Sequence, residues 1–491
     1  MIRSSLPALP RKYLRQPGSL LGATLFCAVA AGVFAQDVVA YLCIALPATL
    51  PLLLWLRAGA LAIPILPVIS GLFFVYYAIP LLRDQSTAYS SDELIQAGIA
   101  VAAFLVAASM ASWPFQRRSD GRFSLFNQSQ IADLQLAPIV FVGLCAGIVF
   151  HLAVVADSLA WLGSSFGLLR SVVLTLASIS CYLLGHTRAL GLLAGPAWAF
   201  AFGGLLLLIL LALSNLFLVG GLMYCLAAFL GYVITAKRIP WLGLGTAFAM
   251  LAVLHAGKFE LRNTYWANGV SEGREISVGQ IPSVMVDWFA AGVDALWSGG
   301  AESDVLERAS LLHMLVLVQR ATPDYIPYLE GETYALLPSM LVPRFVDPEK
   351  TVSQAGLNLL SIRYGLQTLE SVARTTIGWG LVSEAYANFG YWAVIMVGAL
   401  FGAICGALMR LSVGAPPNSL PMFITIAATL VLLNVEADFA YLLTSLVQTL
   451  AAILIVAALA YLLRGQRRVI VPVAPAASAR VHQSIGDASL P

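Results

Sequence analysis

Charged residues are scarce in this chain: 11% of its 491 residues are Asp, Glu, Lys or Arg, whereas 60% are hydrophobic. A soluble protein of this length could not bury so much apolar surface. The alternation of polar and apolar residues typical of an outer-membrane barrel is also missing. The apolar runs, about 20 residues each, match the thickness of a bilayer, and they must be helical because lipid offers the backbone no other hydrogen-bond partners.

Several chemical signatures are absent as well. The six cysteines all lie in apolar runs and none has metal-ligand spacing, which argues against a disulfide framework. No phosphate-binding glycine loop, H-E-x-x-H motif or nucleophile elbow is present. The loops predicted to be cytoplasmic are too short to fold a nucleotide-sugar domain. We therefore expect no cofactor, no metal and no nucleic-acid partner.

The apolar runs predict an all-α polytopic membrane protein with about 12 transmembrane helices. The predicted spans are residues 18–35, 38–56, 60–82, 95–113, 136–156, 165–185, 189–213, 215–235, 240–257, 389–409, 419–435 and 440–463. With the N-terminus inside, every basic residue outside residues 258–374 is cytoplasmic except Arg83 and Arg170. This bias places both termini in the cytoplasm and the long loop in the periplasm, across a bacterial inner membrane. We interpret the first run as a retained helix.

The long loop, residues 258–375, separates an N-terminal membrane domain (1–257, nine spans) from a C-terminal membrane segment (376–465, three spans). A tail rich in Pro, Ala and Ser (466–491) is predicted to be disordered. Residues 258–374 hold nine of the 27 Lys and Arg residues and 14 of the 25 Asp and Glu residues. Such a polar loop on one side of an apolar protein indicates where its chemistry takes place.

Within the loop, residues 276–298 and 304–320 have the pattern of amphipathic helices lying at the membrane surface. Residues 322–351 contain five prolines and are predicted to be mostly irregular. We therefore expect a set of short helices that covers the outer face of a helical bundle.

Two stretches carry a family resemblance. The first runs from Gly331 to Tyr334 and continues through Pro343-Arg344 to Pro348-Glu349-Lys350, and the second is Glu384-Ala-Tyr-Ala-Asn-Phe-Gly390. Together they resemble the G-x-x-Y, P-R…P-x-K and E-x-Y-x-N-F-G elements of the bacterial oligosaccharide repeat-unit polymerases, the O-antigen polymerase or Wzy-type family. The chain departs from that pattern at Val346-Asp347, where the family has an aromatic residue, and at Thr351, where it has a proline.

The resemblance implies a metal-independent integral-membrane glycosyltransferase with a GT-C-like fold. Such enzymes join repeat units carried on undecaprenyl diphosphate at the periplasmic face of the inner membrane. The product is a surface polysaccharide such as the O-antigen of lipopolysaccharide, or an exopolysaccharide. The family works beside a flippase and a chain-length regulator, so these and membrane lipid are the expected partners.

The chemistry of that reaction selects candidate residues. The diphosphate leaving group gains charge, which arginine can stabilise through paired hydrogen bonds, and the attacking hydroxyl benefits from a base. The predicted catalytic residues are Glu384, Arg344, Arg374 and His313, the last because related ligases use loop histidines. The predicted substrate-binding residues are Arg308, Arg363, Lys350, Arg262, Tyr334, Tyr386, Asn388 and Arg170.

Each candidate also has a structural interpretation. An arginine in this loop can pair with one of the many acids or reach lipid headgroups. Glu384 shares a helical face with Asn388, so it can be a base or a hydrogen-bonding group that locks the loop onto the helix. Glu436 and Asp438, in the short turn before the last span, are expected to be solvated, and His255 is expected to serve packing.

Two other functions remain open from the sequence. A polysaccharide ligase, or another transferase that uses lipid-linked sugars, would need the same kinds of residue. A flippase or transporter for lipid-linked glycans would place charged residues in mid-membrane. The predicted spans are almost free of charge, which favours chemistry at the surface over transport.

Overall fold

The computed structural model is helical throughout the part of the chain that it describes, with no strand among those residues. The described residues are 17–82, 88–116, 135–214, 216–267, 276–298, 310–344, 346–372 and 376–465. Nine helical segments in this part are long and apolar enough to cross a membrane: Val38–Arg57, Ile65–Leu82, Ser91–Gln116, Leu136–Val155, Ala160–Leu190, Gly195–Leu213, Leu218–Ala236, Tyr391–Ser412 and Phe439–Leu459. The prediction of an all-helical polytopic membrane protein is therefore confirmed.

The remaining three predicted spans coincide with helices that, over the described residues, are not among those long and apolar enough to cross a membrane. These are α1 (Pro17–Gly32), α9 (Trp241–Ala267) and α18 (Leu420–Leu432). The helix boundaries otherwise follow the apolar runs closely, since α5 (Leu136–Val155) and α17 (Tyr391–Ser412) begin and end within a few residues of the predicted limits. The number of twelve spans stays a prediction.

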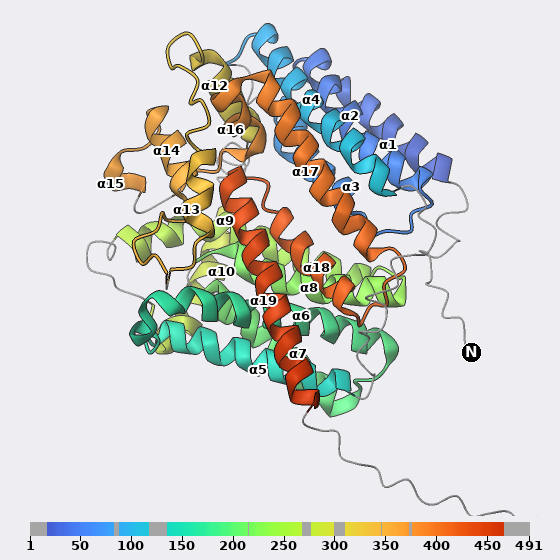
Figure 1. Cartoon of the computed structure of the whole chain (residues 1–491), viewed down its shortest axis with the longest axis vertical. Helices are drawn as coiled ribbons and strands as arrows, with labels where there is room; N and C mark the ends of the chain where they lie inside the picture. Colours follow the sequence, from blue (N-terminus) through green and yellow to red (C-terminus); the bar gives the residue numbers. More distant parts are fainter. Residues whose placement is uncertain are drawn as a thin grey trace, which may run out of the picture.

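One bundle combines the first helices of the chain with a late one. α2 (Val38–Arg57), α3 (Ile65–Phe73) and α4 (Ser91–Gln116) lie beside α17, as the blue and orange ribbons of Figure 1 show. A Cβ atom on Gly402 of α17 would lie 2.0 Å from the carbonyl oxygen of Ala108 in α4. The two backbones therefore touch, as in the small-residue contacts that join membrane helices.

A second bundle consists of α5, α6 (Phe166–Leu190), α7 (Gly195–Leu213) and α8 (Leu218–Ala236). Here too α6 and α8 meet backbone to backbone, because a Cβ on Gly231 would lie 1.8 Å from the Tyr182 carbonyl oxygen. The last helix, α19 (Phe439–Gly465), packs against α6 and α18 (Figure 1). The two bundles have separate hydrophobic cores.

The helix predicted within residues 276–298 is α10 (Ile281–Trp297), and it packs along α9. Gly257 of α9 and Gly292 of α10 form the contact, since a Cβ on Gly292 would lie 2.0 Å from the Val253 carbonyl oxygen. Trp288 is fully buried and its Nε1 donates to the Leu254 carbonyl oxygen at 2.6 Å. The face of α10 that carries Trp288 is thus covered by α9, whereas Phe289 and Trp297 are exposed.

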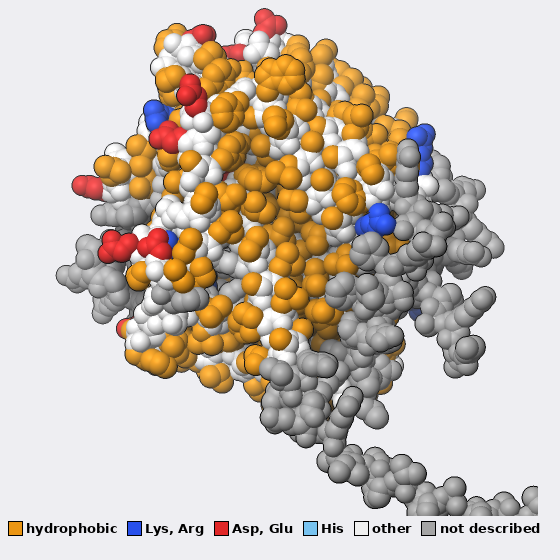
Figure 2. Space-filling model, in the orientation of Figure 1, with side chains coloured by type: hydrophobic (Ala, Val, Ile, Leu, Met, Phe, Trp, Pro, Cys, Tyr) orange, Lys and Arg blue, Asp and Glu red, His pale blue; other side chains and the backbone are white. Residues whose placement is uncertain are grey.

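The rest of the long loop, together with the residues that directly follow it, forms short helices at one end of the bundles. They are α12 (Leu311–Ala321), the 3-10 turn η8 (Tyr334–Leu336), α13 (Leu337–Leu341), α14 (Ala355–Arg363), α15 (Leu369–Val372) and α16 (Gly380–Phe389). They gather at the upper left of Figure 1, and we name this end the loop end. Figure 2 shows acidic side chains over the same region with Lys or Arg side chains among them, further Lys and Arg side chains on the right, and mainly apolar surface between.

Candidate active site

α16 carries the E-x-Y-x-N-F-G motif, and glycines bound it. Every residue from Gly380 to Asn388 is buried. Gly390, which ends the helix, has a φ of 65°, and a Cβ there would lie 2.9 Å from the Tyr328 hydroxyl oxygen. Only glycine fits both that backbone conformation and that space. The final glycine of the motif is therefore a structural requirement of the turn between α16 and α17.

The first motif stretch lies along the C-terminal end of α16. The backbone N–H of Leu329 donates to the Ala387 carbonyl oxygen at 3.0 Å, and that of Glu330 donates to the Asn388 carbonyl oxygen at 3.2 Å. Gly331, with a φ of 91°, donates its N–H to Oδ1 of Asn388 at 3.1 Å. A helix end leaves its last carbonyl groups without partners, and the loop supplies those partners here.

Glu384 lies at the centre of this contact, with none of its surface exposed. Its Oε1 accepts from the Thr333 hydroxyl at 2.8 Å, and its Oε2 accepts from the backbone N–H of Phe439 at 2.6 Å. Asn388 Nδ2 donates to the Glu384 carbonyl oxygen and to Thr333 Oγ1, both at 2.9 Å. Glu384 thereby joins α16, the loop and the start of α19, which matches the structural interpretation of this residue.

Asp438 completes the buried cluster, so the expectation that it is solvated is wrong. It is fully buried, and its Oδ1 accepts from the backbone N–H of Tyr441 at 2.7 Å, which caps α19. Its Oδ2 has no hydrogen-bond partner among the described residues. Burial raises the pKa of Glu384, and the charge of Asp438 raises it further. Burial likewise raises the pKa of Asp438.

The predicted cations of the P-R…P-x-K element fold into one turn. Arg344 is half-buried, and its Nη1 donates to the Pro348 carbonyl oxygen at 3.4 Å. The Lys350 ammonium donates to the carbonyl oxygens of Met340 and Val342, each at 2.7 Å. Burial lowers the pKa of Lys350, and the charge of Arg344 lowers it further. Two positive charges therefore lie close together in this turn.

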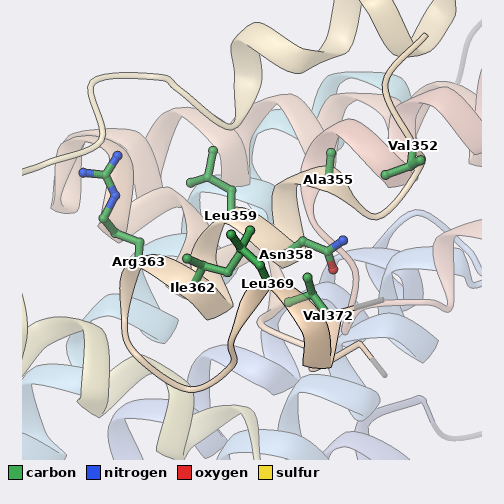
Figure 3. Close-up of a pocket in the computed structure, with 8 residues that line it drawn as sticks. All are labelled: Val352, Ala355, Asn358, Leu359, Ile362, Arg363, Leu369 and Val372. Atoms are coloured by element: carbon green, nitrogen blue, oxygen red, sulfur yellow. The ribbon is translucent and has the colours of Figure 1, made fainter. Parts of the chain in front are cut away.

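Arg363, at the end of α14, lies at the edge of a cavity of about 680 Å³. Its Nη2 forms an exposed ion pair with Glu332 at 2.7 Å. Figure 3 shows its guanidinium at one side of the cavity and apolar side chains of α14 and α15 across the rest. The lining residues are Val352, Ala355, Asn358, Leu359, Ile362, Arg363, Leu369 and Val372. This cavity offers mainly apolar contact.

Other candidates lie apart from the Glu384 cluster. His313 is exposed on α12 and contacts the hydroxyl of Tyr89. Arg262 is half-buried on α9, and its Nη2 donates to the Leu216 carbonyl oxygen at 2.9 Å. Arg170 is exposed near the start of α6. Arg308 and Arg374 lie outside the described residues.

The two predicted tyrosines occupy different surroundings. Tyr334 is half-buried and meets the Phe439 ring edge-on, with centroids 6.1 Å apart, next to the Glu384 cluster. Tyr386 is buried in an aromatic contact with Tyr391, with centroids 5.3 Å apart. Of the predicted residues, the structure thus brings Glu384, Asn388 and Tyr334 together.

Sequence reasoning missed Thr333 and misjudged Asp438. The signal for Asp438 was its position directly before the apolar run of α19, where an aspartate serves as a helix cap. Thr333 sits inside the first motif stretch, but no rule of spacing links it to Glu384. Over the described residues, no group of three or more His, Cys, Asp or Glu side chains is placed to hold a metal ion.

Comparisons with known proteins found no match for this chain among family models, curated proteins or solved structures. The family resemblance therefore stands on the motif residues alone. Fold and site together define a class: a polytopic helical membrane protein with a buried carboxyl cluster beneath short helices at its loop end.

Proposed function

We propose that this chain polymerises oligosaccharide repeat units carried on undecaprenyl diphosphate, at the periplasmic face of a bacterial inner membrane. One observation carries the proposal: the two motif stretches, separate in sequence, are joined by hydrogen bonds from Gly331 and Thr333 to Asn388 and Glu384. Unrelated stretches that resemble family motifs by chance would have no reason to meet. Their union at the loop end supports the interpretation of both as parts of one site.

In this proposal the cations do the electrostatic work of catalysis. The bond from the anomeric carbon to the diphosphate oxygen breaks, and negative charge grows on the leaving group. Arg344 and Lys350, which share one turn, would stabilise that charge by hydrogen bonding to phosphate oxygens. Arg363, exposed beside an apolar cavity, would contact the incoming unit or its lipid.

Glu384 then acts as a positioning residue. Both of its carboxylate oxygens already accept hydrogen bonds from protein groups, and its surface is wholly buried. It would fix the loop that carries Arg344 against α16. His313, which is exposed, remains the candidate base for the attacking hydroxyl.

The test is a reaction of purified full-length protein with undecaprenyl-diphosphate-linked repeat units in detergent, with a chelator present. We expect a ladder of products that differ by one repeat unit. A folded protein that gives no ladder with authentic substrate would contradict the proposal, and a single transfer to another acceptor would indicate a ligase.

Variants of Arg344 sharpen that reaction. Arg344→Ala should abolish the ladder while the protein stays folded, and Arg344→Lys should restore it only in part because lysine cannot form the paired contact. Arg57→Ala, which removes an exposed arginine from the last turn of α2, is the matched control and should leave the ladder unchanged. A normal ladder from Arg344→Ala would show that Arg344 does not take part in the reaction.

A further inference from the structure

The C-terminal part of α9 carries a stripe of basic residues. His255, Lys258 and Arg262 follow each other at intervals of three and four positions, so they share one face of the helix. All three are half-buried. The preceding residues of α9, from 241 onward, are almost wholly apolar. The stripe therefore begins where the apolar part of the helix ends, and we name it the α9 stripe.

Arg262 is fixed in place. Its Nη2 donates to the Leu216 carbonyl oxygen at 2.9 Å, and its guanidinium carbon lies 4.9 Å from the centre of the Phe217 ring. A guanidinium has five N–H donors and keeps its charge at any ordinary pH. This arginine is thus held in one orientation by the residues that link α7 to α8.

Lys258 differs from Arg262. No residue that the structure describes forms a hydrogen bond or an ion pair with its ammonium. Burial lowers the pKa of Lys258, the charge of Arg262 lowers it further, and the charge of Glu436 opposes both effects. The ammonium is not among the wholly buried polar atoms, so a ligand can reach it. An accessible, half-buried cation next to a second, fixed cation is suited to an anionic ligand.

Glu436 connects the α9 stripe to α16. Its backbone carbonyl oxygen accepts from the N–H of Gly380, the first residue of α16, at 3.0 Å. Its Oε1 accepts from the Tyr76 hydroxyl at 2.5 Å, and among the described residues it forms no ion pair with Lys258. The charge of Glu436 acts on Lys258 and on His255, and the two cations of the stripe, its lysine and its arginine, outnumber this one acid.

We infer that the α9 stripe binds the phosphate group of a polyprenyl lipid, with Lys258 as the principal donor and Arg262 as the oriented second one. Phosphate is the anion that suits a lysine and a fixed arginine side by side. A lipid chain suits the stripe because the part of α9 that precedes it is almost wholly apolar. The inference rests on the proposed function, since a polyprenyl diphosphate is the carrier of that reaction.

The test measures binding directly, apart from any polymer. Farnesyl diphosphate is titrated into the full-length protein in detergent by calorimetry, with farnesol as the uncharged control. Wild type should bind farnesyl diphosphate but not farnesol, and inorganic diphosphate should compete. Lys258→Gln should weaken binding at least about tenfold, whereas Arg57→Gln, the loss of an exposed cation elsewhere, should not.

Unchanged binding by Lys258→Gln would overturn the inference. So would displacement of farnesyl diphosphate by phosphatidylglycerol as effectively as by inorganic diphosphate, because the stripe would then serve any phospholipid headgroup. If Lys258→Gln does not fold, Lys258→Met keeps the apolar stem of the side chain without its ammonium and must show the same loss.

The inference and the proposed function fail in different ways. If wild-type protein forms a ladder but does not bind farnesyl diphosphate, the α9 stripe is not a lipid-phosphate site, and the proposed polymerase activity is unaffected. If the protein binds farnesyl diphosphate, Lys258→Gln weakens that binding, and no ladder ever forms, the polymerase proposal is refuted and the lipid-phosphate site is supported.

Discussion

Two polar clusters lie at the loop end, and they differ in how their charges are satisfied. Glu384 is completely buried, and protein groups donate to both of its carboxylate oxygens. Lys258 is half-buried and has no bonded partner among the described residues. The satisfied hydrogen bonds of Glu384 fix the local architecture, whereas the Lys258 ammonium, which is not among the wholly buried polar atoms, is open to a partner from outside. The Glu384 cluster therefore holds the site together, and the α9 stripe, like the turn of Arg344 and Lys350, can receive a ligand.

Glu384→Ala should have the largest effect on stability. The change leaves the Thr333 hydroxyl and the Phe439 N–H buried without their acceptor, at a cost of about 1–3 kcal/mol for each group. We expect a loss of about 3 kcal/mol or more in the free energy of unfolding, measured by thermal or denaturant unfolding in detergent. Glu384→Gln keeps an acceptor oxygen and should lose less. Equal stability of wild type and Glu384→Ala would show that the cluster does not hold the loop.

Gly356→Ala should perturb the same cluster by less. A Cβ at this position would lie 3.0 Å from Cγ and Oδ2 of Asp438. The methyl group must displace either α14 or the carboxyl group, and overpacking of this kind costs about 1–3 kcal/mol. Gly71→Ala is the matched control, because a Cβ there meets nothing within 4 Å. A melting temperature equal to that of the control would show that the structure around Asp438 has room for the added methyl group.

Stability should depend on pH through the carboxyl pair. The pKa of Glu384 is raised in the folded state by burial and by Asp438, so the folded protein holds more protons than the unfolded chain between the two pKa values. The free energy of unfolding therefore falls as pH rises through that window and is greatest below it. Melting temperatures across a pH series should show this slope in wild type and a flatter one in Glu384→Gln. Equal slopes of melting temperature against pH in wild type and Glu384→Gln would contradict a raised pKa of Glu384 in the folded protein.

Glu332→Gln should have the smallest effect. The change removes the ion pair with Arg363, whose two side chains are 46% and 42% exposed. Exposed ion pairs contribute about 0–1 kcal/mol, so the melting temperature should barely change. A loss comparable to that of Glu384→Ala would mean that the surface of the loop, not its buried carboxyl group, ties it to α16.

The hydropathy pattern predicted the helical class and most helix boundaries because membrane thickness leaves few alternatives. It could not predict that α10 would pack on α9, since the glycine contact between Gly257 and Gly292 has meaning only once the two helices are paired. The motifs pointed to Glu384 and Asn388, yet not to Thr333, which reaches Glu384 through a bend of the loop. Lys258 escaped notice because only the structure shows a charge without a partner.

The most direct measurement is the rate of repeat-unit addition against substrate concentration for wild type and Lys258→Gln, with melting temperatures recorded for both. We expect a ladder from both proteins, a higher substrate requirement for Lys258→Gln, and equal melting temperatures. Two results would contradict this expectation: no ladder from folded wild-type protein, or the same concentration dependence in wild type and variant.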